Sequence, residues 1–494
     1  MNKKKVIIIG AGLAGLTAGC YLQMNGYNTE IFEAHDTPGG LCTAWKRKDY
    51  LIEGCIHGLL GSAPTHPLYK LWNELIDMDK LKFIDADIKH LYLFEEGTSF
   101  TQYSNLDTLR KSMIELAPDD KDIIDEFIGD IRKLQSIQMS YHKPKEFFNL
   151  LGKIKMLRAF PLLAVMKKWI SMSSQDFANS FQNPLMQDVV KHFASPILFE
   201  MFVLSEMDLK RCGYPIIGSL KFSKLFEKKY LHCGGKIYYK KRVSKAIVED
   251  NKAVGILLEN GDKHYADIIV SATDGKTAIY DFLDGKYISE TIKKEYSNAN
   301  LNPSKIQISL GVNKTFKDMP RTVKIILLSP YIISDGSLYN SLEIMFYNDL
   351  DALVPRNKTL LIAQLDTKNG EYWSALRDLD YTKYQIEKKK ISEGLISILE
   401  KRIGGIEDNI DMIDVTTPAT YIRYTGSWKG SVQGWANENI FKSNPFKKEL
   451  PGLKNFFMIG QWVEPGGGVP NVFQSGRNLA QIICRRDKRK FHID

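Results

Sequence analysis

The feature that most constrains the fold is a glycine-rich motif directly after the first apolar segment. Residues 6–9 read Val-Ile-Ile-Ile, a β-branched run that is typical of a parallel strand buried on both faces. The motif comprises Gly10, Ala11, Gly12, Leu13, Ala14 and Gly15. In such a turn the first glycine permits the tight bend, the second admits a pyrophosphate, and the third allows close helix–strand packing. Since residues 16–24 then have a helical composition, the order predicts a βαβ dinucleotide-binding unit.

An acidic residue ends the second strand expected in this unit. Gly26 ends the helix, residues 28–32 form the strand, and Glu33 follows about twenty residues after the glycines. A carboxylate at this place accepts hydrogen bonds from a ribose 2′-hydroxyl, whereas it repels a 2′-phosphate. We therefore expect Glu33 and the adjacent Ala34 to hold the adenosine of a dinucleotide other than NADP.

Two further glycine-rich turns accompany the first one. The earlier turn contains Gly39, Gly40 and Leu41. The later turn follows a short apolar strand that ends at Gly460, and it includes Gly468, Val469 and Pro470 ahead of a helix predicted from Val472. The positive end of a helix suits the negative charge that develops at N1/O2 of a reduced flavin. Ordinary turns and a plain glycine-rich helix cap are the alternatives.

These motifs together resemble the phytoene desaturase-like FAD-dependent oxidoreductases, with their carotenoid desaturase, carotenoid isomerase and retinol saturase relatives. The segment 233–273 resembles the hairpin-bearing insertion of that family, in which the position of Val243 contacts the adenine side of FAD. The segment 416–435 resembles the part that precedes the last strand. One departure concerns the loop after the second glycine motif, where the usual aspartate–glycine pair is replaced by Glu53-Gly54.

The resemblance implies FAD as cofactor and an α/β fold. A Rossmann-like, glutathione-reductase-like FAD-binding domain is expected to carry an inserted α+β substrate domain. Residues 1–70, 215–285 and 446–494 are expected to form the discontinuous FAD-binding domain. Residues 71–214 and 286–445 would form the substrate-binding domain over the isoalloxazine ring, where ligand pockets usually lie.

An apolar and basic stretch at 146–172 lies inside the substrate-binding part. It combines Phe and Trp residues with interleaved Lys and Arg residues. A stretch of this composition favours a peripheral membrane interface, and core-facing helices with solvated lysines are the equal alternative. The net charge of +9 agrees with an anionic surface as partner.

Composition and cysteine spacing limit the classes of ligand and the cellular location that we expect. The 494 residues are 44% hydrophobic and 25% charged, as in an ordinary globular protein of two domains. No nucleic-acid-binding motif accompanies the positive charge. The six cysteines never form a CxxC pair, which disfavours a metal site or disulfides and favours a cytoplasmic location. No apolar run reaches the ~18 residues that a membrane-spanning helix needs.

The expected activity is hydride transfer between flavin N5 and a carbon–carbon bond of an apolar polyene, isoprenoid or lipid substrate. Desaturation and saturation stay open, as does the identity of the electron partner. His57 is the candidate general acid, with a structural histidine as the alternative. The competing functions are double-bond isomerisation without net redox change, amine oxidation, and prenyl binding without catalysis of the GDP-dissociation-inhibitor type.

Overall fold

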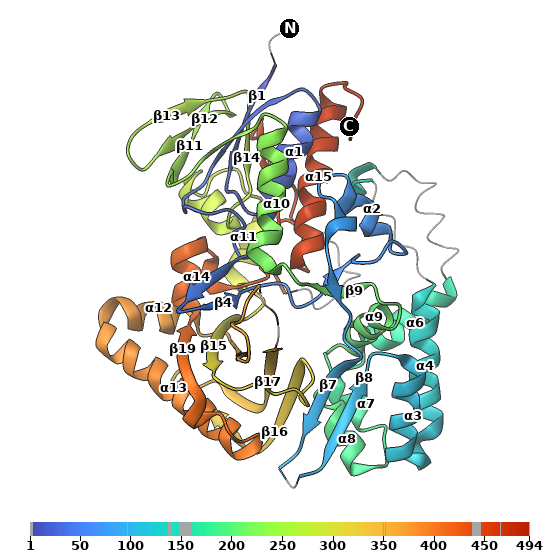
Figure 1. The fold of residues 1–494 in the computed structure, drawn as a ribbon. Helices are drawn as coiled ribbons and strands as arrows, with labels where there is room; N and C mark the ends of the chain where they lie inside the picture. The colour runs from blue at the N-terminus through green and yellow to red at the C-terminus, as the bar shows by residue number, and fades with distance from the viewer. Residues whose placement is uncertain are drawn as a thin grey trace.

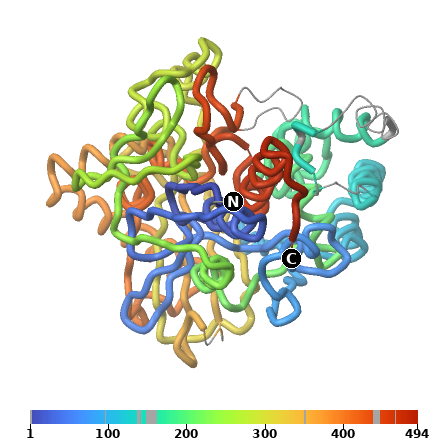
Figure 2. Tube along the Cα trace, turned by 90° about the horizontal axis from the view of Figure 1, so that it is seen from above, coloured from blue at the N-terminus to red at the C-terminus, as the bar shows by residue number. Residues whose placement is uncertain are grey.

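The computed structural model is built on two large β-sheets with smaller sheets and helices around them, stacked along the long axis of the molecule (Figure 1). The described residues are 3–95, 97–136, 141, 143–147, 160–348, 350, 352–436, 446–464 and 466–493. The blue N-terminal and red C-terminal segments lie side by side at one end of the molecule (Figure 2). Lys4 and Asp487 form an ion pair of 2.8 Å there, so the two ends of the chain build one layer together.

The first layer contains a five-stranded parallel sheet within the described part of the chain. Its order is β10 (Lys236–Tyr238), β2 (Asn28–Phe32), β1 (Lys5–Ile9), β14 (Ile268–Ser271) and β20 (Phe456–Met458). The β-branched run of β1 is buried on both faces, as expected for a central parallel strand. Strands from the beginning, middle and end of the sequence thus share one sheet, which is the Rossmann-like arrangement that the motifs predicted.

Three helices cover one face of this sheet: α1 (Leu13–Met24), α10 (Gly218–His232) and α15 (Gly468–Arg486) (Figure 1). Helix α15 lies very close to α1. A Cβ added at Gly476 of α15 would lie only 2.5 Å from the carbonyl oxygen of Ala14 on α1. The opposite face packs against a three-stranded antiparallel sheet. Its strands are β11 (Val243–Glu249), β12 (Lys252–Leu258) and β13 (Lys263–Tyr265).

The second layer is built on a seven-stranded mixed sheet, counted within the described residues. Its order is β19 (Ile410–Thr416), β15 (Ser304–Val312), β18 (Thr359–Thr367), β17 (Leu338–Asn348), β16 (Thr322–Ile332), β7 (Ile88–Leu93) and β8 (Ser99–Tyr103). Helices α12 (Gly370–Leu379) and α13 (Tyr381–Arg402) cover the face that buries Trp373 and Leu395. A largely antiparallel sheet with helices segregated to one face is the α+β insertion that was expected, so the predicted fold class is confirmed.

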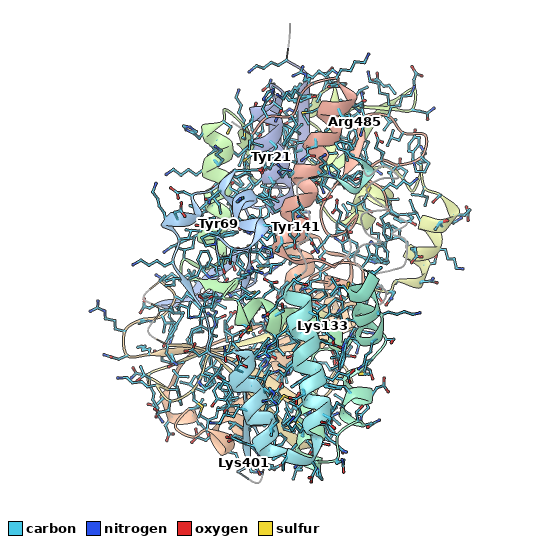
Figure 3. All side chains as sticks on the ribbon, turned by 90° about the vertical axis from the view of Figure 1, so that its right-hand side faces the viewer. Tyr21, Tyr69, Lys133, Tyr141, Lys401 and Arg485 are labelled. Carbon is cyan, nitrogen blue, oxygen red and sulfur yellow. The ribbon has the colours of Figure 1, made fainter. Side chains whose placement is uncertain are left out.

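A helical cluster flanks the β8 edge of this sheet (Figure 1). Its helices are α3 (Leu106–Leu116), α4 (Lys121–Gln135), α6 (Phe160–Ile170), α7 (Ser174–Ala178), α8 (Pro184–Val190) and α9 (Ile197–Asp208). Figure 3 places Tyr21 and Arg485 in the half that holds the parallel sheet, Lys133 in the other half, and Lys401 at the opposite end. The remaining elements are β3 (Ala44–Arg47), β4 (Tyr50–Glu53), β5 (Leu59–Leu60), α2 (Pro67–Asn73), β6 (Phe83–Ile84), β9 (Cys212–Pro215), α11 (Glu290–Asn298) and α14 (Pro418–Thr425).

Contacts between the layers cross the domain boundaries expected from the sequence. Tyr50 on β4 packs in one apolar cluster with Tyr347 on β17. Tyr296 on α11 and Trp435 pack with Ile7 in the core beneath the parallel sheet. The boundaries at residues 70, 215, 285 and 446 therefore remain a prediction, because segments on each side of them share cores.

The apolar basic stretch at 146–172 is described only in part, since residues 148–159 lie outside the described residues. Its second half forms α6, in which the Trp169 side chain is 1% exposed. That indole packs edge-on against Phe127 at 5.7 Å and donates a hydrogen bond to Asp130. Trp169 is thus a core residue, in agreement with the interpretation of this stretch as core-facing helices. None of the described helices is both long and apolar enough to cross a membrane.

Candidate functional site

The first glycine turn is held in place by the strand and helix around it. The N–H of Gly10 donates to the carbonyl of Phe32, across from β1 to the end of β2. A Cβ at Gly15 would lie 2.1 Å from the carbonyl oxygen of Gly10, so no other residue fits there without moving the backbone. Gly12 is different: no atom of the described residues lies within 4 Å of a Cβ built on it. The turn therefore leaves open space beside Gly12, whereas the backbone of Gly10 fills the space beside Gly15.

Two helices begin at this open space. Gly12 is the N-cap of α1, and Gly467 is the N-cap of α15. Neither helix has a side-chain cap or an acidic residue in its first turn, as far as the described residues go. The first N–H groups of a helix have no partner within the helix and carry its positive dipole end. Two such ends beside one cavity favour a bound group with negative charge.

The second glycine motif pairs with the first one. The N–H of Gly39 donates to the carbonyl of Ala11 at 2.9 Å, and Gly12 and Gly39 form an isolated parallel bridge. A Cβ at Gly39 would lie 2.4 Å from the carbonyl oxygen of Cys42. The two glycine motifs, separated in the sequence by α1 and β2, therefore form one continuous backbone surface.

This surface is one wall of a cavity of about 550 Å³ between the two layers. The residues predicted from the sequence that line it are Gly12, Leu13, Ala14, Gly39, Gly40, Leu41, His57, Gly460, Gly468, Val469 and Pro470. Gly10, Ala11, Gly15, Glu33, Ala34 and Val243 are predicted residues outside that lining. The structure thus brings the three glycine turns and His57 together, although they come from both ends of the chain.

Glu33 lies at the end of β2, beside the first turn. Its carboxylate accepts the N–H of Ala11 at 2.7 Å and the N–H of His35 at 2.8 Å. Val243, at the start of β11, belongs to the same apolar cluster as Phe32, the neighbour of Glu33. The Glu33 carboxylate is thus fixed to the turn at Ala11, the residue before Gly12 of the cavity lining.

These features fit FAD. Its pyrophosphate is anionic and needs free N–H groups and close backbone approach, which Gly12 and the two helix starts offer. Its adenosine ribose needs an acceptor such as Glu33. The flavin ring would be held in the part of the cavity lined by Gly460 and Val469.

Glu53, the residue that departs from the family motif, is a buried anchor. Its side chain is 0% exposed and accepts hydrogen bonds from the Ser219 N–H and the Tyr214 hydroxyl. Burial raises the pKa of this carboxyl above its ordinary value, against the effect of these donors. Glu53 thus ties β4 to the start of α10 and positions Gly54, which lines the cavity.

His57 faces the cavity, and its Nδ1 lies 3.5 Å from the hydroxyl oxygen of Tyr347. His57 is an exposed residue that faces the cavity. Desolvation of the ring by the surrounding protein, and then the charges of Arg321 and Lys305, lower the pKa of His57 to about 4. His57 is therefore neutral at pH 7, which makes it a weak general acid there.

Polar residues that no sequence motif predicted also line the cavity. Lys305, Glu343, Gln364 and Tyr421 come from the inserted part of the chain and form its second wall, whereas Asp274 follows β14 of the parallel sheet. Burial raises the pKa of Asp274 to about 6, although three backbone N–H groups donate to its carboxylate. A signal existed in β15, where polar residues alternate with isoleucines from Lys305 to Ser309. Such alternation predicts a strand with one polar face.

Comparisons with known proteins agree with a Rossmann-like cofactor domain at the N-terminus. Residues 8–75 match the model of the NAD(P)-binding Rossmann-like domain family. The chain is 24% identical to a 1-hydroxycarotenoid 3,4-desaturase of Flavobacterium sp. (strain P99-3), over 97% of this chain and 99% of the relative. It is also 24% identical to a chloroplastic prolycopene isomerase of Daucus carota, over 97% of this chain and 79% of the relative.

Solved structures show the same fold. An oxidoreductase from Methanosarcina mazei has a TM-score of 0.57 at 18% identity, with 97% of this chain and 100% of that chain covered. A putrescine oxidase variant has a TM-score of 0.61 at 13% identity, with 98% and 99% covered.

Fold and site together define an FAD-dependent oxidoreductase with a Rossmann-like cofactor domain. The full length of the chain is similar to carotenoid desaturases and prolycopene isomerases, in agreement with the resemblance that its motifs indicated.

Proposed function

We propose that this enzyme oxidises or reduces a carbon–carbon bond of a polyene or isoprenoid substrate. The observation that carries the proposal is the single cavity in which three glycine turns face a second wall from the inserted sheet. The full-length similarity to a carotenoid desaturase supports the substrate class. Bound FAD supplies a hydride acceptor or donor at N5.

The residues of the chain hold and orient both partners. Gly12 and the N–H groups that begin α1 would hold the pyrophosphate, and Glu33 would hold the ribose. The N–H groups of Gly468 and Val469 would stabilise negative charge on the reduced flavin ring. The second wall keeps the substrate against the ring and limits water. His57 is assigned to positioning, because a neutral imidazole has no proton to donate readily at pH 7.

The test is anaerobic incubation of purified holoenzyme with a panel of polyenes and isoprenoids, followed by mass spectrometry and absorbance spectroscopy. A product whose mass differs by two hydrogen atoms, together with a change in flavin redox state, supports the proposal. No mass change with any member of the panel, in protein that carries FAD, contradicts it.

Isomerisation is the second candidate, because prolycopene isomerases are among the full-length relatives. The same incubation distinguishes the two activities. A product of unchanged mass and shifted absorbance spectrum, formed only when the flavin is reduced first, assigns isomerisation.

We also infer peripheral contact with an anionic membrane. A surface groove beside the end of α15 is lined by Lys143, Arg485, Lys488 and Arg489 together with Phe147. Arg485 projects from α15 at the cofactor-domain end of the molecule (Figure 3). Each such cation near an anionic surface contributes about 1 kcal/mol.

Vesicle flotation tests this contact. Binding to phosphatidylserine vesicles at low salt that is lost at high salt supports the inference, and the Arg485→Glu/Lys488→Glu double variant should bind more weakly. Absence of binding to anionic vesicles at low salt contradicts the inference.

A further inference from the structure

The inserted sheet presents a row of polar side chains across its middle. Gln307 on β15 is paired with Gln364 on β18, and Lys324 on β16 is paired with Glu343 on β17. The side chains of these paired residues also contact each other. The Gln364 amide donates to the Gln307 side chain at 2.9 Å, and the Lys324 ammonium lies 3.5 Å from the Glu343 carboxylate. A row of this kind is unexpected in the wall of a purely apolar pocket.

The row continues away from the cavity into a buried ionic network. His90 lies 3.4 Å from Glu343 and 3.0 Å from the side chain of Gln102. Gln102 donates to Glu200, whose 3%-exposed side chain also pairs with Lys89. Desolvation raises the pKa of Glu343. The hydrogen bond from His90 and the nearby ammonium groups outweigh this effect and hold the pKa of Glu343 well below its ordinary value. Buried ion pairs of this kind contribute little net stability, because desolvation offsets their attraction.

Glu343 is where this network opens onto the cavity. Its side chain is 43% exposed, in contrast to the buried members behind it. Gln364, Lys305 and His57 line the cavity with Glu343. The hydrogen bonds and ion pairs of the network therefore hold the Glu343 carboxylate in the wall of the cavity.

The charges on this wall define the group that fits it. The ammonium of Lys305 is paired with Asp366 at 2.7 Å, and the carboxylate of Glu343 lies 3.5 Å from Lys324. Because each charge already has a partner, neither calls for a charged ligand. A neutral group that both donates and accepts hydrogen bonds finds a partner of each kind. It can donate to Glu343 and accept from Lys305, Gln364 or His57. Hydroxyl is the simplest group with this property.

We propose that Glu343 and Gln364 bind a hydroxyl group of the substrate, so that the enzyme selects hydroxylated polyenes over the corresponding hydrocarbons. This inference rests on the proposed function and narrows its substrate class. Glu343 is then a specificity-determining residue, and the buried residues behind it are positioning residues.

The experiment compares lycopene with 1-hydroxylycopene in the same detergent micelles. Binding to the holoenzyme is followed by tryptophan fluorescence quenching, and flavin reduction is followed by anaerobic stopped-flow absorbance. We expect the hydroxylated probe to bind the wild-type enzyme at least about tenfold more tightly, since a site built for a hydroxyl leaves polar groups unpaired when the hydroxyl is missing.

Three variants complete the design. Glu343→Leu and Gln364→Met should lose most of the discrimination by weakening binding of the hydroxylated probe alone. Gln364→Met leaves no unpaired charge, so it remains informative if Glu343→Leu does not fold. Glu393→Gln, in an exposed pair with Lys389 on α13, is the control and should discriminate as the wild type does.

The outcomes separate the two proposals. Equal affinity of the wild type for both probes, with flavin reduction by both, overturns the selection of hydroxyl groups and leaves the proposed function intact. Retained discrimination in the folded Glu343→Leu and Gln364→Met variants overturns the assignment of these residues. Absence of both binding and flavin reduction with these two probes, in enzyme that converts another member of the polyene panel, overturns the inference and leaves the proposed function intact.

Discussion

The carboxylate of Glu33 accepts the N–H of Ala11 at 2.7 Å and so joins the end of β2 to the glycine turn between β1 and α1. Its other oxygen accepts the N–H of His35 at 2.8 Å. Each oxygen keeps further lone pairs for a ligand. Because two backbone donors hold the carboxylate, it needs little reorganisation when a ribose hydroxyl arrives.

Replacement of this carboxylate should weaken FAD binding. Hydrogen bonds to a charged group contribute ~1.5–3 kcal/mol each, so Glu33→Ala should lower the affinity for FAD by about ten- to a hundredfold. The measurement is the flavin-to-protein ratio after extensive dialysis, with isothermal titration of the apoprotein. Glu259→Ala removes an exposed acid near the β12–β13 turn and should retain FAD fully. Full retention by Glu33→Ala would assign the ribose to another residue.

The close approach within the first turn predicts a strict requirement for glycine. A Cβ at position 15 would overlap the Gly10 carbonyl oxygen at 2.1 Å, and that oxygen is a backbone atom, which cannot move aside as the end of a side chain can. Gly15→Ala should therefore give protein that is destabilised by more than ~3 kcal/mol or that lacks FAD, as overpacked cores do. Thermal unfolding and flavin content measure the effect.

Gly129→Ala is the matched control for this substitution. Gly129 lies inside α4, and no atom of the described residues lies within 4 Å of the place that an added Cβ would take, with the backbone of its own helix left aside. An alanine there should stabilise the protein by up to ~1 kcal/mol through helix propensity. Equal stability of the two variants would mean that the turn relaxes easily.

The cofactor side of the site was predictable because it depends on local backbone chemistry. Glycines, a strand, a helix and an acid at fixed spacing indicate the turn, whichever residues surround it. The polar wall was not predictable in the same way. Gln307, Gln364 and Glu343 are far apart in the sequence and become neighbours only through strand pairing. The alternation in β15 indicated a polar face, but only the sheet order shows that this face looks onto the cavity.

The stretch at 146–172 shows the limit of a local pattern. A basic, aromatic composition is the same for a membrane-facing helix and for a helix packed on a core. Trp169 is buried because α4 and α7 supply Phe127 and Phe177 around it, which the composition of the stretch does not reveal.

The lowered pKa of His57 predicts a loss of stability in acid. Its pKa of about 4 in the folded protein lies below the ordinary 6.5, so the unfolded chain binds the proton first as the pH falls. The stability that the neutral ring contributes is complete above pH ~6.5 and is lost as the pH falls towards about 4. The urea midpoint should therefore drop less between pH 7 and 5 in His57→Gln than in the wild type. An identical drop in both proteins would contradict this account.

The start of α15 should govern the redox chemistry of the flavin more than any side chain near it. Gly468 has φ +78°, a conformation that disfavours other residues, and it lines the cavity beside the uncapped N–H groups of the helix. Gly468→Ala should displace these donors, and the loss of one preorganised donor slows such steps by about a hundred- to a thousandfold. The flavin midpoint potential should also become more negative by about 30–60 mV, which corresponds to one charge-assisted hydrogen bond.

Two controls make this prediction specific. Gly336 also has a positive φ, of +84°, but it lies in the β16–β17 turn, and so Gly336→Ala introduces similar backbone strain without a change in flavin potential or reduction rate. His57→Ala removes the candidate general acid and should keep the rate of flavin reduction within about an order of magnitude, because an imidazole that is neutral at pH 7 contributes little as an acid. Stopped-flow reduction by the substrate found in the polyene panel, and a redox titration without substrate, provide the two measurements. An intact rate and potential in Gly468→Ala beside a collapsed rate in His57→Ala would reverse the assignment, and would make acid–base chemistry by His57 the source of the catalysis.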